Sequence, residues 1–105
     1  MTESPRTIAV FTGNRAEYGL QLPILRAIDA HPDLTYRLIV SGAHLDGNFG
    51  RTIAEIESDG FEIAAEVNIT MAEDSLVATT QAISSGILST SKVLQEIQPD
   101  IFVVY

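Results

Sequence analysis

A short apolar run, residues 8–11, leads directly into a small polar stretch, residues 12–19, and then into a helical pattern. A run this short that is apolar throughout predicts a strand buried on both faces, as in a parallel sheet. In an open α/β sheet the corner after such a strand lies at the carboxyl edge, where ligands bind. Backbone N–H groups and the helix dipole favour an anion there, and Arg15 adds a forked cation suited to phosphate oxygens. The corner that contains Gly13, Arg15 and Gly19 is therefore predicted to be a phosphate-recognition loop.

Apolar runs and helical spacings alternate along the rest of the chain. Strands are expected at about residues 7–12, 35–40, within 61–69 and at 100–105, with helices at about 16–30, 49–59 and 75–97 between them. Right-handed crossovers then give a β-α-β-α-β-α-β parallel sheet that is covered by helices. The expected fold class is α/β with the strand order 3-2-1-4 of a Rossmann-like half-domain. The switch point of that order lies between the first and fourth strands, beside Gly13 and Arg15.

Pro23 leaves the start of the first helix open. Proline has no N–H group, so residue 23 cannot donate a hydrogen bond to the Gly19 carbonyl. The regular helix begins either near Leu20, with Pro23 in its first turn, or at Ala16, with a bend at Pro23. Both alternatives leave backbone groups near Gly19 unpaired, which suits a ligand contact.

The last helix and the acidic residues show two further patterns. Asp74 or Ser75 is expected to cap the helix, Gly86 permits close packing, and Pro99 ends it. A stripe at helical spacing runs along this helix and consists of Leu76, Thr80, Ile83, Ile87, Leu94 and Ile97. We interpret Glu17 as an acid that complements a helix dipole, and we assign to a solvated face the acids Glu55, Glu57, Asp59, Glu62 and Glu66.

Composition excludes several classes of protein. The chain has 105 residues, enough for one modest domain, and its net charge of −8 argues against a nucleic-acid surface or an anionic membrane as partner. No apolar run approaches the roughly 18 residues that cross a bilayer, and no secretory signal is recognisable. The chain lacks cysteine, and its histidines, His31 and His44, are well separated. We therefore expect no metal site, no cofactor and a cytoplasmic location.

Four ordered segments resemble the opening of the hydrolysing UDP-N-acetylglucosamine 2-epimerases, which feed sialic acid and related nonulosonic acid synthesis. The similar segments are residues 12–19 with 22–25, residues 38–45, Phe49-Gly50 followed by Ile53, Ile56, Glu57 and residues 59–61, and residues 98–104. They cover nearly the whole chain in order. In the non-hydrolysing relatives Pro-Glu follows the arginine, whereas this chain has Ala-Glu-Tyr-Gly, which favours the hydrolysing branch.

This resemblance implies a two-domain GT-B architecture in which a UDP-sugar lies between two Rossmann-like halves. The family eliminates UDP to give a glycal and then adds water to release N-acetylmannosamine. The residues that match Arg15 and Gly19 contact the diphosphate in that family, and Gly13 belongs to the same loop. His44 matches the histidine of the family's Gly-x-His-Leu segment, so it is a candidate to bind substrate or move a proton.

The chain departs from the family pattern at its end. Family members continue from the fourth strand into Gly-Asp-Arg and a second domain, whereas this sequence stops at Tyr105. We therefore expect an N-terminal GT-B domain, residues 1–105, that is truncated after its fourth strand and has no epimerase activity alone. The alternative is a non-catalytic Rossmann-like module that binds a nucleotide or mediates assembly. The unfilled edge of such a sheet allows self-association into a homo-oligomer.

Overall fold

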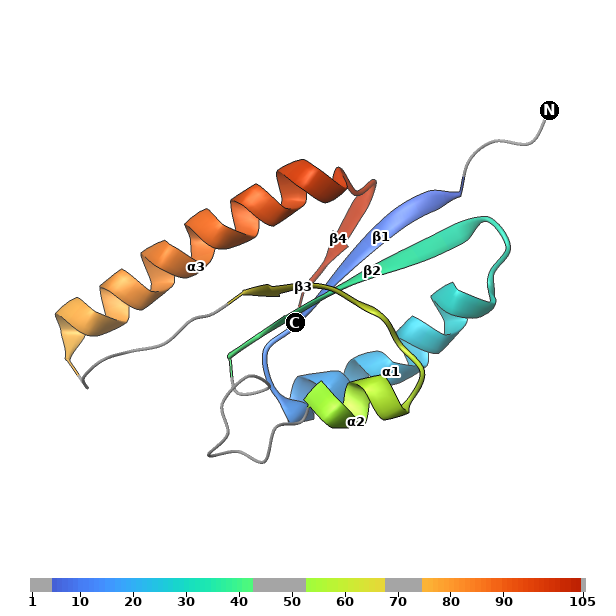
Figure 1. Cartoon of the computed structure of the whole chain (residues 1–105), viewed down its shortest axis with the longest axis horizontal. Helices are drawn as coiled ribbons and strands as arrows, with labels where there is room; N and C mark the ends of the chain where they lie inside the picture. The colour runs from blue at the N-terminus through green and yellow to red at the C-terminus, as the bar shows by residue number, and fades with distance from the viewer. Residues whose placement is uncertain (1–4, 43–52, 68–74, 105) are drawn as a thin grey trace.

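The computed structural model describes residues 5–42, 53–67 and 75–104 (Figure 1). Strands and helices alternate along these ranges, as the sequence predicts. The elements are β1 (Arg6–Thr12), α1 (Arg15–Ala30), β2 (Leu34–Ser41), α2 (Ile53–Ser58), β3 (Ile63–Val67), α3 (Leu76–Ile97) and β4 (Ile101–Val103).

The strands form one parallel sheet in the order β3-β2-β1-β4, which confirms the predicted order. Val10 of β1 pairs with Leu38 of β2 on one side and with Val103 of β4 on the other. The central strands are apolar and buried on both faces at residues 8–10 of β1 and 38–40 of β2. This double burial is what the short apolar runs predicted.

Helices cover both faces of the sheet, with α1 and α2 on one side and α3 on the other (Figure 1). The larger core lies on the α1–α2 side and is formed by Ile8, Val10, Tyr18, Leu25, Ile28, Leu38, Val40, Ile53, Ile56 and Phe61. The smaller core, under α3, is formed by Ala9, Ile39 and Val67, with Phe11, Val93, Leu94, Ile97 and Phe102 packed against them. Phe11 and Phe102 meet edge to face, with their ring centroids 6.3 Å apart.

Helix α1 settles the alternatives that Pro23 left open. It begins at Arg15, directly after its N-cap Asn14, and continues through Pro23 to Ala30. The start near residue 16 is therefore the better of the two predictions. Proline has no N–H group, so the Gly19 carbonyl lacks the usual donor four residues further along the helix.

Strand β4 is joined to the start of β1 by two hydrogen bonds. The Thr7 N–H group donates to Asp100 Oδ2 at 2.7 Å, and the Asp100 N–H group donates to the Thr7 carbonyl at 2.8 Å. The two residues are 93 positions apart in the chain. These bonds align the short β4 strand with the centre of the sheet.

Helix α3 packs against the sheet with only the C-terminal end of the predicted stripe, Leu94 and Ile97. Ser75 caps it, as expected, and its buried positions are the small residues Ala78, Ala82 and Gly86. Small side chains let the helix approach its neighbours closely, and this agrees with the role expected of Gly86. The large side chains of Leu76, Ile83 and Ile87 remain exposed.

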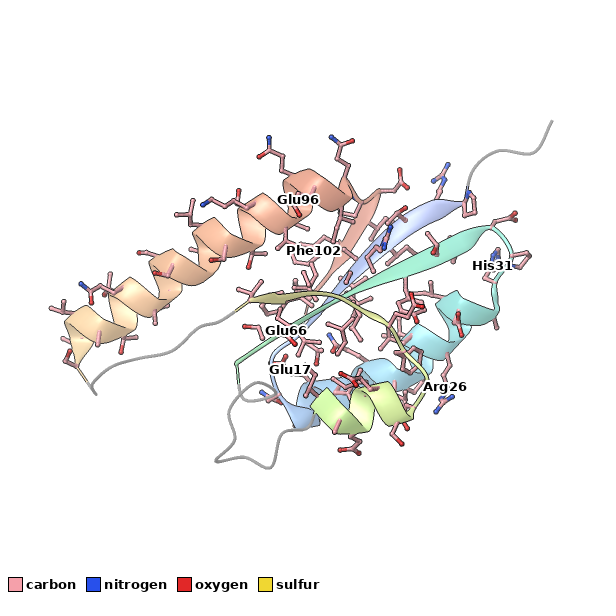
Figure 2. All side chains as sticks on the ribbon, in the orientation of Figure 1. Glu17, Arg26, His31, Glu66, Glu96 and Phe102 are labelled. Atoms are coloured by element: carbon pink, nitrogen blue, oxygen red, sulfur yellow. The ribbon has the colours of Figure 1, made fainter. Side chains whose placement is uncertain are left out.

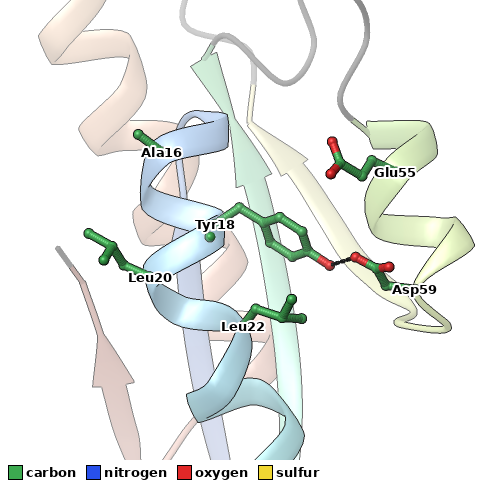
Figure 3. Close-up of a pocket in the computed structure, with 7 residues that line it drawn as sticks. Ala16, Tyr18, Leu20, Leu22, Glu55 and Asp59 are labelled. Atoms are coloured by element: carbon green, nitrogen blue, oxygen red, sulfur yellow. Dashed lines mark hydrogen bonds between the residues drawn. The ribbon is translucent and has the colours of Figure 1, made fainter.

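A hydrogen bond between Tyr18 and Asp59 joins α1 to the end of α2 (Figure 3). The Tyr18 hydroxyl donates to Asp59 Oδ2 at 2.5 Å, and Tyr18 itself is buried. Burial of Tyr18, followed by its bond to the Asp59 carboxylate, raises the pKa of the tyrosine hydroxyl well above its usual range. The assignment of Asp59 to a solvated face was therefore wrong, whereas the other acids of that group are exposed: Glu55, Glu57, Glu62 and Glu66.

Gly42, directly after β2, touches the loop that follows β1. Its φ angle is +61°, and an added Cβ would lie 2.7 Å from the Gly13 carbonyl oxygen. Both the left-handed backbone and the close approach require glycine. The contact brings the carboxyl ends of β1 and β2 together.

We expect Gly42→Ala to lower the free energy of unfolding by about 2 kcal/mol or more, because the new Cβ meets backbone in a strained conformation. Urea unfolding measures this change. Gly19→Ala is the matched control, since a Cβ at that helical position meets nothing within 4 Å. The control should gain about 0.5–1 kcal/mol. Equal stability of the two variants would contradict the close contact at Gly42.

We expect Tyr18→Phe to lower the free energy of unfolding by about 1–2 kcal/mol at neutral pH, because the bond to Asp59 is lost. The raised pKa of Tyr18 adds a pH dependence. Tyrosine ionises at about pH 10 in the unfolded chain but not in the folded one, so wild-type stability is retained below about pH 10 and falls above it. The Phe variant should lose that part of the decline, as urea unfolding at several pH values can measure.

The control is Tyr36→Phe, which removes a hydroxyl that accepts a hydrogen bond from the Glu62 N–H group at 3.0 Å. This control should retain the decline that arises from Tyr18. If Tyr18→Phe and wild type lose stability in parallel above pH 10, the buried hydroxyl is not the cause.

Candidate functional site

The candidate site is the corner between β1 and α1, at the carboxyl rim of the sheet. Thr12, fully buried, ends β1, and Gly13 and Asn14 make the turn into α1. The end of β2 lies alongside through the contact of Gly42 with Gly13. The structure therefore puts the predicted loop at the rim where parallel sheets bind their ligands.

Glu17 closes this corner from inside α1. Its Oε2 accepts a hydrogen bond from the Gly13 N–H group at 2.8 Å, and its Oε1 accepts one from Asn14 Nδ2 at 3.4 Å. In return, the Glu17 N–H group donates to Asn14 Oδ1 at 2.9 Å. This is a variant of the capping box, in which a cap residue and an acid three positions later satisfy each other's backbone groups.

The capping network changes what the loop can offer a ligand. Backbone N–H groups of this corner were predicted to favour an anion, but the Gly13 N–H group is bonded to Glu17. Glu17 also adds a negative charge beside the helix N-terminus. An anion at this corner would therefore depend on the first turn of α1 and on nearby cations rather than on the Gly13 amide.

Arg15 is the first residue of α1, so its backbone lies at the corner as predicted. Its side chain lies outside the part of the chain that the structure describes. His44, the candidate catalytic residue, and the family-like Phe49-Gly50 also fall outside the described residues. Their predicted roles stay predictions.

Gly19 lies one turn into α1 and is exposed. A Cβ at this position would meet nothing within 4 Å, so the fold does not require glycine there. Glycine inside a helix costs about 1 kcal/mol relative to alanine. An exposed helical glycine without a packing reason is compatible with close approach of a ligand to the backbone.

A hollow of about 510 Å³ lies between α1 and α2 (Figure 3), lined by Ala16, Tyr18, Gly19, Leu20, Leu22, Glu55 and Asp59. Its walls are apolar on the α1 side and carry two carboxylates on the α2 side. Carboxylates repel a diphosphate, so this hollow is a poor place for one. It borders Gly19 without being the predicted anion site.

Two buried polar side chains at the rim were missed by the sequence analysis. Gln21, on α1, donates through Nε2 to the Phe11 carbonyl at 2.8 Å, while its Oε1 has no partner among the described residues. Ser41, at the end of β2, is fully buried, and its Oγ likewise has none there. A polar residue on the same helical face as Tyr18 and Leu25 was the available signal for Gln21.

The other histidine has a structural role at the opposite end of α1, far from Glu17 (Figure 2). His31 caps the helix, and its Nδ1 accepts a hydrogen bond from the Asp33 N–H group at 3.0 Å. In the described ranges, no three His, Cys, Asp or Glu residues gather as metal ligands would. Nor is any helix in those ranges both long enough and apolar enough to cross a membrane.

Comparisons with known proteins agree on one family. Residues 26–105 match the model of the family described as UDP-N-acetylglucosamine 2-epimerase. The chain is 31% identical over 96 residues to a UDP-N,N'-diacetylbacillosamine 2-epimerase (hydrolyzing) from Legionella pneumophila, an alignment that covers 91% of this chain and 26% of the relative. It is also 31% identical over 101 residues to a GDP/UDP-N,N'-diacetylbacillosamine 2-epimerase (hydrolyzing) from Campylobacter jejuni, covering 96% of this chain and 26% of that protein.

A solved structure agrees with these sequence matches. The UDP-GlcNAc 2-epimerase from Neisseria meningitidis, bound to UDP-GlcNAc, superposes with a TM-score of 0.69 at 22% identity, covering 94% of this chain and 25% of that one. The chain thus spans about a quarter of the length of the relatives it matches. Its sheet is that of the Rossmann-like N-terminal half of a GT-B fold. The chain belongs to the UDP-N-acetylglucosamine 2-epimerase family, of which it represents an N-terminal portion.

Proposed function

We propose that this chain forms the first part of a hydrolysing UDP-N-acetylglucosamine 2-epimerase. The whole enzyme converts UDP-N-acetylglucosamine and water into N-acetylmannosamine and UDP, for sialic or nonulosonic acid synthesis. Residues 1–105 are the beginning of its N-terminal GT-B domain, and the enzyme works in the cytoplasm. Support comes from the family match and from two relatives whose names carry the word hydrolyzing.

One observation carries the proposal: α1 begins at Arg15, at the carboxyl end of a central strand. In the order β3-β2-β1-β4, this corner adjoins the switch point between β1 and β4, where ligands bind in such sheets. A guanidinium at the first position of a helix joins its own charge to the dipole and to the first-turn N–H groups. These are the features that a diphosphate needs.

The parts of the diphosphate site differ in what they contribute. Arg15 supplies the charge and Gly19 allows close approach of the ligand, while Gly13 shapes the turn with its amide bonded to Glu17. His44, two residues after Gly42, is the proposed sugar contact or proton carrier. The Glu17 carboxylate opposes the bound anion, so the affinity of the loop reflects a balance of charges.

The reaction needs groups that this chain does not contribute. Elimination takes the proton from C2 of the sugar and breaks the bond between C1 and the UDP oxygen. Water then adds across the resulting double bond, with a proton returned to C2. The chain supplies the diphosphate contact, which stabilises the negative charge of the leaving UDP. The family's carboxylates and the second half of the cleft belong to the rest of the enzyme.

A UDP titration of the 105-residue chain, followed by NMR chemical shifts at millimolar UDP, tests the site. We expect Arg15→Ala to weaken binding by roughly 10-fold or more, because a charge-assisted phosphate contact is lost. We expect Glu17→Gln to tighten binding roughly 3- to 10-fold, because a like charge near the diphosphate is removed. The amide of glutamine can still accept the Gly13 hydrogen bond.

Each variant has a control with the same change in net charge. Arg37→Ala removes an exposed arginine of β2, and Glu96→Gln removes an exposed acid from the last turn of α3. Neither residue belongs to the proposed site, so both controls should bind UDP nearly as wild type does. Equal effects of variant and control would mean that only the overall charge matters, and the loop would lose its assigned role.

We expect the 105-residue chain to bind UDP without turning over UDP-N-acetylglucosamine. The carboxylates that move the C2 proton come from the rest of the enzyme, so the chemical step has no base. Incubation of the pure chain with substrate, followed by chromatography for N-acetylmannosamine, measures this. Release of N-acetylmannosamine above the uncatalysed rate would contradict the proposal that the base lies in the rest of the enzyme.

A further inference from the structure

The hollow between α1 and α2 includes Gly19, where α1 has no side chain. Ala16, Gly19 and Leu20 line it from α1, together with Tyr18 and Leu22. A Cβ at Gly19 would meet nothing within 4 Å, so the space beside this residue is open. The hollow measures about 510 Å³, and small-molecule sites typically measure roughly 300–1,000 Å³. It therefore has the size of a site for an organic molecule rather than for a bare ion.

The two sides of the hollow differ in chemistry. On the α1 side, the side chains of Ala16, Leu20 and Leu22 are apolar, and Leu20 is 58% exposed. On the α2 side, Glu55 and Asp59 point toward α1 (Figure 3). The described residues that line the hollow thus carry two carboxylates and no basic group. A ligand that complements both sides has an apolar body and a positive charge.

The Tyr18 hydroxyl indicates that the electrostatic potential on the α2 side is negative. Its pKa is raised first by burial, and then by the hydrogen bond to Asp59 and by the charges of Asp59 and Glu55. Arg26 lowers this pKa, but its guanidinium lies over the Phe61 ring, 5.7 Å from the centroid, and Arg26 is not among the described residues of the lining. The bond from Tyr18 also holds the Asp59 carboxylate in place before a ligand arrives.

We propose that this hollow binds a small organic cation, an alkylguanidinium or alkylammonium ion. Its charge lies beside Glu55 and Asp59, and its alkyl chain lies along Gly19 and Leu22 (Figure 3). A guanidinium presents its N–H groups in a planar fork that carboxylate oxygens accept. The alkyl chain removes exposed apolar surface of α1 from water. Ion pairs at exposed positions are weak, so the affinity is in the millimolar range and falls as salt rises.

An NMR titration of the isotope-labelled 105-residue chain with n-butylguanidinium at low salt tests the proposal. We expect it to shift the backbone amide signals of Gly19, Leu22 and Glu55. Neutral n-butylurea lacks the charge and guanidinium ion lacks the alkyl chain, so each should bind roughly 5-fold more weakly or less. Equal binding of either compound, or no shift with n-butylguanidinium at millimolar concentrations, overturns the proposal. The titration contains no UDP, so its outcome does not depend on the diphosphate site.

Two variants test the carboxylate side. Glu55→Gln removes one charge and should weaken n-butylguanidinium binding about 2- to 5-fold. Glu57→Gln is its matched control, because Glu57 is an exposed acid of the same helix that is absent from the described lining of the hollow. This control should bind as wild type does. Equal effects of the two substitutions would mean that the cation responds only to net charge, which overturns the site.

Two more variants test the open space on α1. Gly19→Leu fills it without a clash and should abolish binding, whereas Ala27→Leu adds the same side chain at another exposed position of the helix and should not. Circular dichroism confirms that each variant is folded. Unchanged binding by a folded Gly19→Leu chain overturns the location of the ligand.

The last comparison distinguishes a free molecule from an arginine of a protein partner. A short peptide with blocked ends and one arginine carries the same cation and alkyl chain. The hollow has the volume of a small-molecule site, and its described residues offer nothing specific to a peptide backbone, so n-butylguanidinium should bind at least as tightly as the peptide. Tighter binding of the peptide overturns the assignment to a free molecule.

Discussion

Burial of β1 and β2 on both faces is the constraint on which the rest of the structure depends. Strand segments that are buried on both faces need helices on each side of the sheet, and parallel strands need those helices as crossovers. Every strand-to-helix corner then falls at the same rim of the sheet. This is why Gly13, Arg15 and Gly42 come together although nearly 30 residues separate the first from the last.

The corner after β1 combines a hydrogen-bonded turn with two opposite charges, those of Arg15 and Glu17. Glu17 accepts a hydrogen bond from the Gly13 N–H group of the turn, and the cap Asn14 accepts one from the Glu17 N–H group of the helix, so the turn is held without a ligand. The same carboxylate that orders the turn opposes an anion beside it. A turn held in this way needs no ligand to fix its shape, and the Glu17 carboxylate would weaken the hold of the loop on the diphosphate proposed above.

Local patterns predicted the elements and their order, whereas the roles of particular side chains depended on tertiary contacts. Apolar runs and the cap Ser75 are local features of the sequence, so strand and helix positions could be predicted from it. The cap Asn14 was not predicted. The bond from Tyr18 to Asp59 joins residues 41 positions apart, and no local pattern distinguishes Asp59 from the solvated acids near it. The stripe predicted along α3 was only partly right, because Leu94 and Ile97 pack against the smaller core whereas Leu76, Ile83 and Ile87 are exposed.

The link between Thr7 and Asp100 bears on the order in which the sheet assembles. Pairing of β1 with β2 closes a short segment around α1, whereas pairing of β1 with β4 closes about 90 residues of chain. The entropy cost of loop closure rises with loop length, and the three residues of β4 form few hydrogen bonds to offset that cost. We therefore expect β4 to dock last during folding and to detach first in native-state fluctuations, so the strand beside the proposed ligand crevice is also the least firmly held.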